Sequence, residues 1–139
     1  MARLMFSQGY SIPYTSVLTA ETTNPVYSSN AIEAYYSRIG RLIHFTIFVD
    51  CSKFTSFGSG RYHLTLPFEP IMDYMFRDGG LHEAGNHYAV GADAEESIDL
   101  KLKTIGANGQ DTSFTSSSPH NLDSTNYWYV SGTYMAKIL

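Results

Sequence analysis

Charged side chains are scarce in this chain, and basic residues are fewer than acidic ones. Asp, Glu, Lys and Arg make up 16% of the 139 residues, and the formal net charge is −4. A protein that binds nucleic acid needs a basic patch to neutralise phosphates, and the sequence has no run of like charges. The composition therefore argues against nucleic acid as a partner.

Long hydrophobic runs and cysteines are also lacking. No stretch approaches the 18 or more apolar residues of a membrane span, so we expect no membrane partner. The apolar run at residues 4–6 is too short for a signal peptide, which predicts synthesis in the cytoplasm of the cell that expresses the protein. The single cysteine, Cys51, excludes an internal disulfide. Free cysteines are mostly buried, so we expect Cys51 to be a small hydrophobic core residue.

The clearest positive signal is a strand pattern at residues 42–51. Every second residue is apolar. Because successive strand residues point to opposite sides of a sheet, these apolar side chains share one face, and the residues between them form the other face. The apolar face consists of Ile43, Phe45, Ile47, Val49 and Cys51. The opposite face consists of Leu42, His44, Thr46, Phe48 and Asp50. Because Leu42 and Phe48 make the second face only half polar, we expect that face to be partly covered too.

Similar segments recur along the chain, separated by glycine, proline and asparagine turns. Further strands are predicted at residues 31–39, 61–68, 71–77, 87–94, 97–104 and 127–136. Residues 54–60, 78–80 and 113–126 are predicted to be loops or turns. In residues 97–104 the alternation places Ile98, Leu100 and Leu102 inward and Asp99, Lys101 and Lys103 outward.

Eight or so short strands at this spacing predict an all-β fold, a single two-sheet β-sandwich or jelly roll. At 139 residues the chain is one domain by length. We expect residues 1–20 to form an N-terminal arm and residues 21–139 to form the sandwich domain.

Catalytic and metal-binding patterns are absent from the sequence. His82 and His87 resemble a zinc-protease motif, but they are five residues apart, and that motif needs two histidines four apart on a helix. His44 and His63 fall on polar strand faces, which favours cross-strand pairs. We therefore expect no enzyme activity, no catalytic residue, no metal site and no cofactor. Two alternatives stay open. Two carboxylates from distant strands could together form a glycosidase site, and tyrosines could line a sugar-binding surface.

Two groups of segments resemble a known family when they are taken in order. The first group is residues 34–45, followed by residues 58–60 and 64–68; the second is residues 114–119 with residues 129–136. The order is similar to that of small β-sandwich domains of bacteriophage tail fibres and other virion-surface proteins. The resemblance covers about residues 22–136, and its motifs are structural rather than catalytic.

The resemblance implies a jelly-roll homotrimer that serves as a fibre tip, a knob or a capsid decoration. A chain this short fits a decoration (cement) protein better than a fibre, with the virion as its location and the major capsid protein as its partner. The apolar arm then becomes the candidate docking element, namely Arg3, Leu4, Met5, Phe6 and Tyr10. Equally, this segment could add a short strand to the domain's own sheet. The alternative function is a tail-fibre or tail-tip receptor-binding knob that recognises a host-surface glycan.

Overall fold

The structure, a computed structural model, describes residues 11–137 and contains almost only β-strands. The strands are β1 (Ile12–Tyr14), β2 (Thr19–Ala20), β3 (Val26–Tyr27), β4 (Ile32–Ile39), β5 (Leu42–Asp50), β6 (Phe54–Ser56), β7 (Tyr62–Thr65), β8 (Tyr74–Phe76), β9 (Asp78–Glu83), β10 (Asn86–Ala94), β11 (Asp99–Ile105), β12 (Asp111–Ser113) and β13 (Tyr127–Met135). One short 3₁₀ helix, η1 (Cys51–Lys53), follows β5. The predicted all-β sandwich is confirmed.

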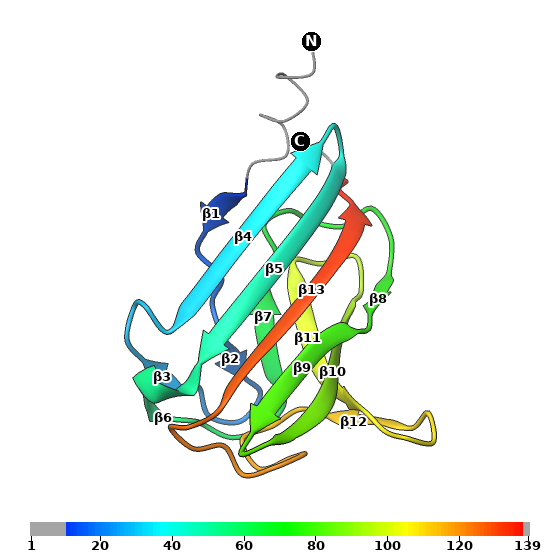
Figure 1. Cartoon of the computed structure of the whole chain (residues 1–139). Coiled ribbons are helices and arrows are strands. Elements are labelled where there is room, and N and C mark those ends of the chain that lie inside the picture. Colours follow the sequence, from blue (N-terminus) through cyan, green and yellow to red (C-terminus); the bar gives the residue numbers. More distant parts are fainter. Residues whose placement is uncertain (1–10, 138–139) are drawn as a thin grey trace.

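Two packed layers arise from one antiparallel sheet that curls back on itself (Figure 1). The front layer has the order β1-β4-β5-β13-β9, and the back layer contains β8, β10, β11, β7 and β2. Strand β10 joins the layers, because its first half pairs with β9 and its second half pairs with β11. At the change of layer, a Cβ on Gly91 would lie 2.5 Å from the carbonyl oxygen of Phe76, so the close backbone approach there requires glycine. A separate pair, β3 and β6, lies at the end of the sandwich away from the termini.

The core lies between the layers and follows the predicted alternation. All five residues assigned to the apolar face of β5, from Ile43 to Cys51, have no exposed surface. Leu100 and Leu102 of β11 face them from the back layer and are equally buried. Burial of such a side chain stabilises the fold by about 1.5–3 kcal/mol. Burial also raises the pKa of the Cys51 thiol to about 12, and Cys51 is the core residue that its position predicted.

Aromatic rings fill the centre of the sandwich. Trp128 of β13 stacks on Tyr62 of β7 at 6.1 Å between ring centres and meets Phe114 edge-on at 4.9 Å. The hydroxyl of Tyr62 donates a hydrogen bond of 2.6 Å to the carbonyl oxygen of Phe57. These rings connect the two layers, so the core is continuous across the sandwich.

The segment predicted as an arm enters the sheets in its described part. β1 pairs with β4, with Ile12 opposite Tyr36, and β2 pairs with β7. Residues 12–14 thus add a short strand to the domain's own sheet. Because β1 runs antiparallel to β4, its first residue, Ile12, lies at the end of β1 nearer the β4–β5 turn. The candidate docking residues Arg3, Leu4, Met5, Phe6 and Tyr10 lie outside the described residues.

Several local predictions were wrong. Residues 78–80, predicted as a turn, begin strand β9, and the turn lies at Ala84 and Gly85, whose φ angles are 41° and 88°. Gly79 is required inside the sheet, because a Cβ there would lie 2.5 Å from the carbonyl oxygen of Tyr129. The loop predictions at residues 54–60 and 113–126 also missed β6 and the end of β12. Ile98, predicted to point inward, is exposed because it precedes the first paired residue of β11.

Candidate functional site

The outer face of the back layer is charged and linked by ion pairs. Lys103 of β11 lies at its centre and is buried, although the alternation predicted an exposed side chain. Its Nζ lies 2.9 Å from Asp111 Oδ2 and 2.9 Å from Asp93 Oδ1, the latter without hydrogen-bond geometry. Arg77 lies 3.9 Å from the same Asp111 oxygen. The neighbouring strands β10 and β12 therefore cover this lysine with carboxylates rather than leaving it in water.

The two carboxylates determine the protonation of this cluster. Burial opposes the charged ammonium of Lys103, but its contacts with Asp93 and Asp111 outweigh that effect and raise the pKa of Lys103. The lysine in turn lowers the pKa of Asp111. The cluster is thus an ion-pair network that links β10, β11 and β12, and its charges are already matched within the chain.

His63 of β7 belongs to the same charged face. Its Nε2 lies 2.7 Å from Oε2 of Glu21, and its Nδ1 lies 3.0 Å from Oδ2 of Asp99. The hydrogen bond from His63 is the main cause of the lowered pKa of Glu21. Among the described residues, no serine, threonine or cysteine side chain hydrogen-bonds to His63, so the arrangement lacks the nucleophile of a catalytic triad. It links the segment after β2 to the back layer.

The outer face of the front layer has the opposite chemistry. Its paired residues form rows across the strands, dominated by aromatic, aliphatic and hydroxyl side chains. Three acidic residues belong to these rows, and in the described part of the chain no lysine or arginine does. From the turn end to the far end the rows are Ile39–Leu42–Met135, Ser37–His44–Thr133, Tyr35–Thr46–Ser131–Asp78, Glu33–Phe48–Tyr129–Gly80 and Asp50–Tyr127–His82. Such a face suits contact with another molecule better than exposure to water alone.

Five exposed hydrophobic residues gather at the β4–β5 turn end of this face. The row Ile39–Leu42–Met135 continues into Ile71, whose backbone N–H donates to the carbonyl oxygen of Met135, and Met72 follows in the chain. Their exposed fractions range from 38% to 66%. We refer to these five residues as the end patch. Figure 1 shows that both termini of the described chain lie at this end of the sandwich.

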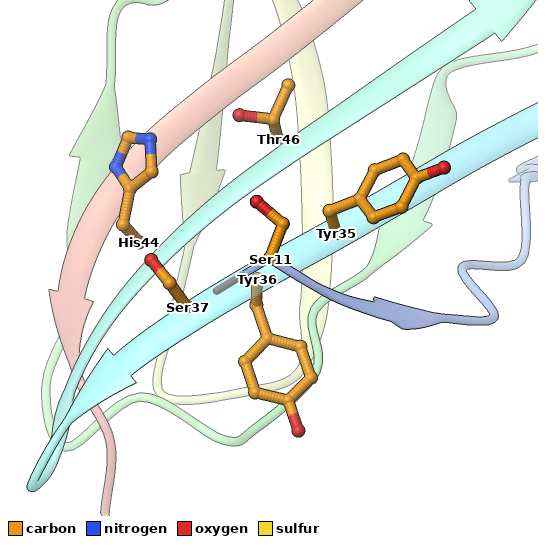
Figure 2. A pocket seen from close by; sticks show the side chains of 6 residues that line it. All are labelled: Ser11, Tyr35, Tyr36, Ser37, His44 and Thr46. Carbon is orange, nitrogen blue, oxygen red and sulfur yellow. The ribbon is translucent and has the colours of Figure 1, made fainter. Parts of the chain in front are cut away.

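A hollow of about 290 Å³ lies next to the end patch on the same face. Figure 2 shows its lining: Ser11, Tyr35, Tyr36, Ser37, His44 and Thr46. The rings of Tyr35 and Tyr36 point to opposite sides of β4, while the hydroxyls of Ser11 and Thr46 lie near the centre of the view. His44 Nδ1 lies 2.9 Å from the hydroxyl of Thr133, the cross-strand pairing that its polar face predicted. We refer to this site as the hydroxyl hollow.

A second hollow, of about 500 Å³, lies at the far end of the face. Its lining consists of Gly79, Gly80, His82, His87, Tyr88, Ala89, Tyr127 and Tyr129. Tyr129, Gly80 and Ala89 are paired neighbours across β13, β9 and β10. The hollow forms beside Tyr129 because glycine has no side chain and alanine has only a methyl group. We refer to this site as the glycine hollow.

The two histidines of the failed zinc motif meet at the glycine hollow. Strands β9 and β10 form a hairpin that places His82 directly opposite His87, with ring centres 4.9 Å apart. Only the position of the turn, at Ala84 and Gly85 instead of residues 78–80, could have revealed this pairing from the sequence. Within residues 11–137 no group of three or more His, Cys, Asp or Glu side chains is arranged to hold a metal ion.

Comparisons with protein-family models, with curated proteins and with solved structures found no match for this chain. In the described residues, no helix has the length and apolar character needed to cross a membrane. The features that can indicate a function are therefore the two outer faces, the end patch and the two hollows.

Proposed function

We propose that this chain is a structural protein of a bacteriophage virion, a trimeric decoration protein that docks on the particle surface. The ordered motifs that resemble virion-surface β-sandwiches suggest the class of protein. The contrast between a charged back face and a front face whose described rows contain no lysine or arginine supports a role in protein contact. No catalytic role is assigned to any residue, because His63, the side chain most like a catalytic base, is paired on both ring nitrogens with carboxylates.

The observation that carries the proposal is the position of the end patch. Its five apolar side chains lie at the end of the sandwich toward which the start of β1 points. The residues that precede it in the sequence include the apolar Leu4, Met5 and Phe6. Exposure of an apolar surface or an apolar segment to water is unfavourable, so both are assigned to docking.

The end patch is assigned to contact between copies of the chain, and residues 1–10 are assigned to the particle. Fully covering the patch removes from water the equivalent of about 2.4 complete hydrophobic side chains per copy, or about 4–7 kcal/mol. Three copies then contribute about 12–21 kcal/mol, against an association cost of about 4–15 kcal/mol for each of the two steps that form a trimer. In a trimer assembled through this end, the three arms start close together and can engage the major capsid protein jointly.

Removal of residues 1–10 tests the docking role. The truncated chain keeps all thirteen described strands, so its thermal melting should stay close to that of the full chain. Its occupancy on phage particles, measured by co-sedimentation with particles stripped of the native protein, should fall to background. Full occupancy of the truncated chain would refute the docking role of Arg3, Leu4, Met5, Phe6 and Tyr10.

The alternative is a tail-fibre or tail-tip knob that recognises a host-surface glycan. The glycine hollow favours it, because Tyr127 and Tyr129, which line it, lie at the start of β13, whereas Met135 of the end patch lies at its other end. A trimer fixed to the particle through its docking end would leave this end free to meet a cell surface. The two functions differ in location, and an image of labelled whole particles separates shell from tail.

A further inference from the structure

We propose that the glycine hollow binds a neutral saccharide of one or two rings. The inference rests on the receptor-binding alternative and does not depend on trimer formation or on docking. The hollow, about 500 Å³, falls in the size range of small-molecule sites. The small residues Gly79, Gly80 and Ala89 line it together with five aromatic residues.

A ladder of adjacent rings, of which Tyr127 and His82 are stacked and the other pairs are tilted, supplies the surface on which a sugar can pack. Phe48 lies 5.5 Å from Tyr127, Tyr127 stacks on His82 at 4.7 Å, and His82 lies 4.9 Å from His87, measured between ring centres. Each ring is held by its neighbours, so little conformational freedom is lost when a ligand packs against them. The C–H groups on one face of a pyranose ring form an apolar surface of the same size as an aromatic ring. The ladder therefore offers a fixed stacking platform.

Polar groups beside the platform can pair with sugar hydroxyls. The hydroxyl of Tyr129 lies over Gly80, 3.7 Å from where a Cβ of that residue would be. The Nδ1 atom of His82 is buried and has no hydrogen-bond partner among the described residues. A buried polar atom without a partner is unfavourable, and a hydroxyl reaching it after a small ring rotation would satisfy it. A sugar hydroxyl can both donate and accept, so it suits either state of the imidazole.

The charge of the surroundings selects against other ligands. No lysine, arginine, aspartate or glutamate lines the hollow, so it has no counter-charge for a phosphate or a carboxylate. The two acidic residues of β9 flank the lining: Asp78 precedes Gly79 and accepts a hydrogen bond of 3.0 Å from Ser131, and Glu83 follows His82 and lies 3.5 Å from His120. Their negative charges disfavour acidic sugars. A purely apolar side chain of a partner protein would leave the polar groups of His82 and Tyr129 unpaired.

Titration of the full chain with sugars, followed by ¹⁵N–¹H NMR, tests the inference. The panel contains glucose, galactose, mannose, N-acetylglucosamine, maltose and lactose, with glucuronic acid and N-acetylneuraminic acid as charged comparators. At least one neutral sugar should shift the amide signals of Gly79 and Gly80 saturably, and the acidic sugars should shift them much less. No saturable shift with any neutral sugar at about 50 mM, well above the millimolar dissociation constants of weak ligands, would overturn it.

Matched variants locate the site. Gly80→Val places a side chain in the hollow, where a Cβ lies 3.4 Å from the ring of Tyr129, an ordinary contact. Tyr127→Ala removes the centre of the stacking ladder. Each should weaken binding about tenfold or more, with thermal melting confirming that each variant is folded. Tyr35→Ala is the control, because Tyr35 is 41% exposed against 39% for Tyr127 but lines the hydroxyl hollow.

The possible outcomes are distinct. Binding lost in Tyr35→Ala and kept in Gly80→Val would overturn the assignment and move it to the hydroxyl hollow. A trimer that docks on particles but binds no sugar would overturn this inference and leave the decoration role standing. Sugar binding by a chain that stays monomeric would support this inference while contradicting the trimer.

Discussion

Replacement of Ile39 by lysine tests the role of the end patch. Ile39 is 66% exposed at the end of β4, beside Leu42 in the paired row. Because its side chain has few contacts within the chain, the substitution should change the melting temperature of a single copy little. In the assembled state the same side chain is covered, so the lysine loses the burial energy of isoleucine and must also desolvate its ammonium group.

The magnitude follows from the exposed fraction. Covering the exposed two-thirds of Ile39 contributes about 1–2 kcal/mol per copy. Summed over three copies, the loss is at least about 3 kcal/mol, which weakens trimer formation by about two orders of magnitude. The desolvation of three neighbouring ammonium groups adds to this loss.

The assay is size-exclusion chromatography with light scattering, from 1 to 100 μM protein, a range chosen to span about the micromolar affinities of specific interfaces. Wild type should elute as a trimer, and Ile39→Lys should dissociate toward the monomer. Ile98→Lys is the matched control, because Ile98 is also exposed but lies outside the end patch; it should stay trimeric. A monomeric wild type at 100 μM, or equal masses for both variants, would refute the reasoning.

Two further predictions concern the fold. Lys103→Met leaves two carboxylates without their shared ammonium and should lower the free energy of unfolding by about 1–3 kcal/mol in urea titrations. Lys103 lowers the pKa of Asp111, so the contribution of this ion pair to the free energy of unfolding is present above the unfolded pKa of an aspartate, about 4, and is lost as the pH falls through the lower folded pKa. The stability of the Lys103→Met variant should therefore depend less on pH in this acid range. An unchanged dependence would contradict the ion-pair assignment. Gly132→Ala places a Cβ 2.2 Å from Cδ1 of Phe76 and should cost about 1–3 kcal/mol through overpacking, whereas a variant as stable as wild type would show that this ring moves freely.

The strands and the core could be predicted because their signal is local. The alternation from Ile43 to Cys51 needs no knowledge of any other segment, and each of its apolar residues is buried. The same is true of Leu100 and Leu102. Period-two patterns therefore gave the fold class and most of the core.

The remaining features depend on which strands become neighbours. Gly79 belongs to an Asp-Gly-Gly segment that is typical of turns, but glycine is required there because the backbones of β9 and β13 approach closely. Lys103 is buried because Asp111 comes from β12, a strand that the sequence pattern did not predict. The side-by-side position of His82 and His87 requires the hairpin register. No pattern within one segment contains this information.

The end patch was missed for the same reason. Ile39, Leu42 and Met135 belong to three different strands and form one row only in the observed register. Each alone is an ordinary exposed hydrophobic residue. Their meeting with Ile71 at one end creates the surface on which the proposed assembly depends.

Methionine oxidation of the intact protein tests the docking end most directly. Met72 in the end patch is 53% exposed in the single chain, and Met75 on the back layer is 64% exposed. Peroxide oxidises accessible methionines to sulfoxides, which peptide mass spectrometry resolves. If copies of the chain cover the end patch, Met72 and Met135 should oxidise much more slowly than Met75. Equal rates for Met72 and Met75 would show that the patch is open to water and would contradict the account.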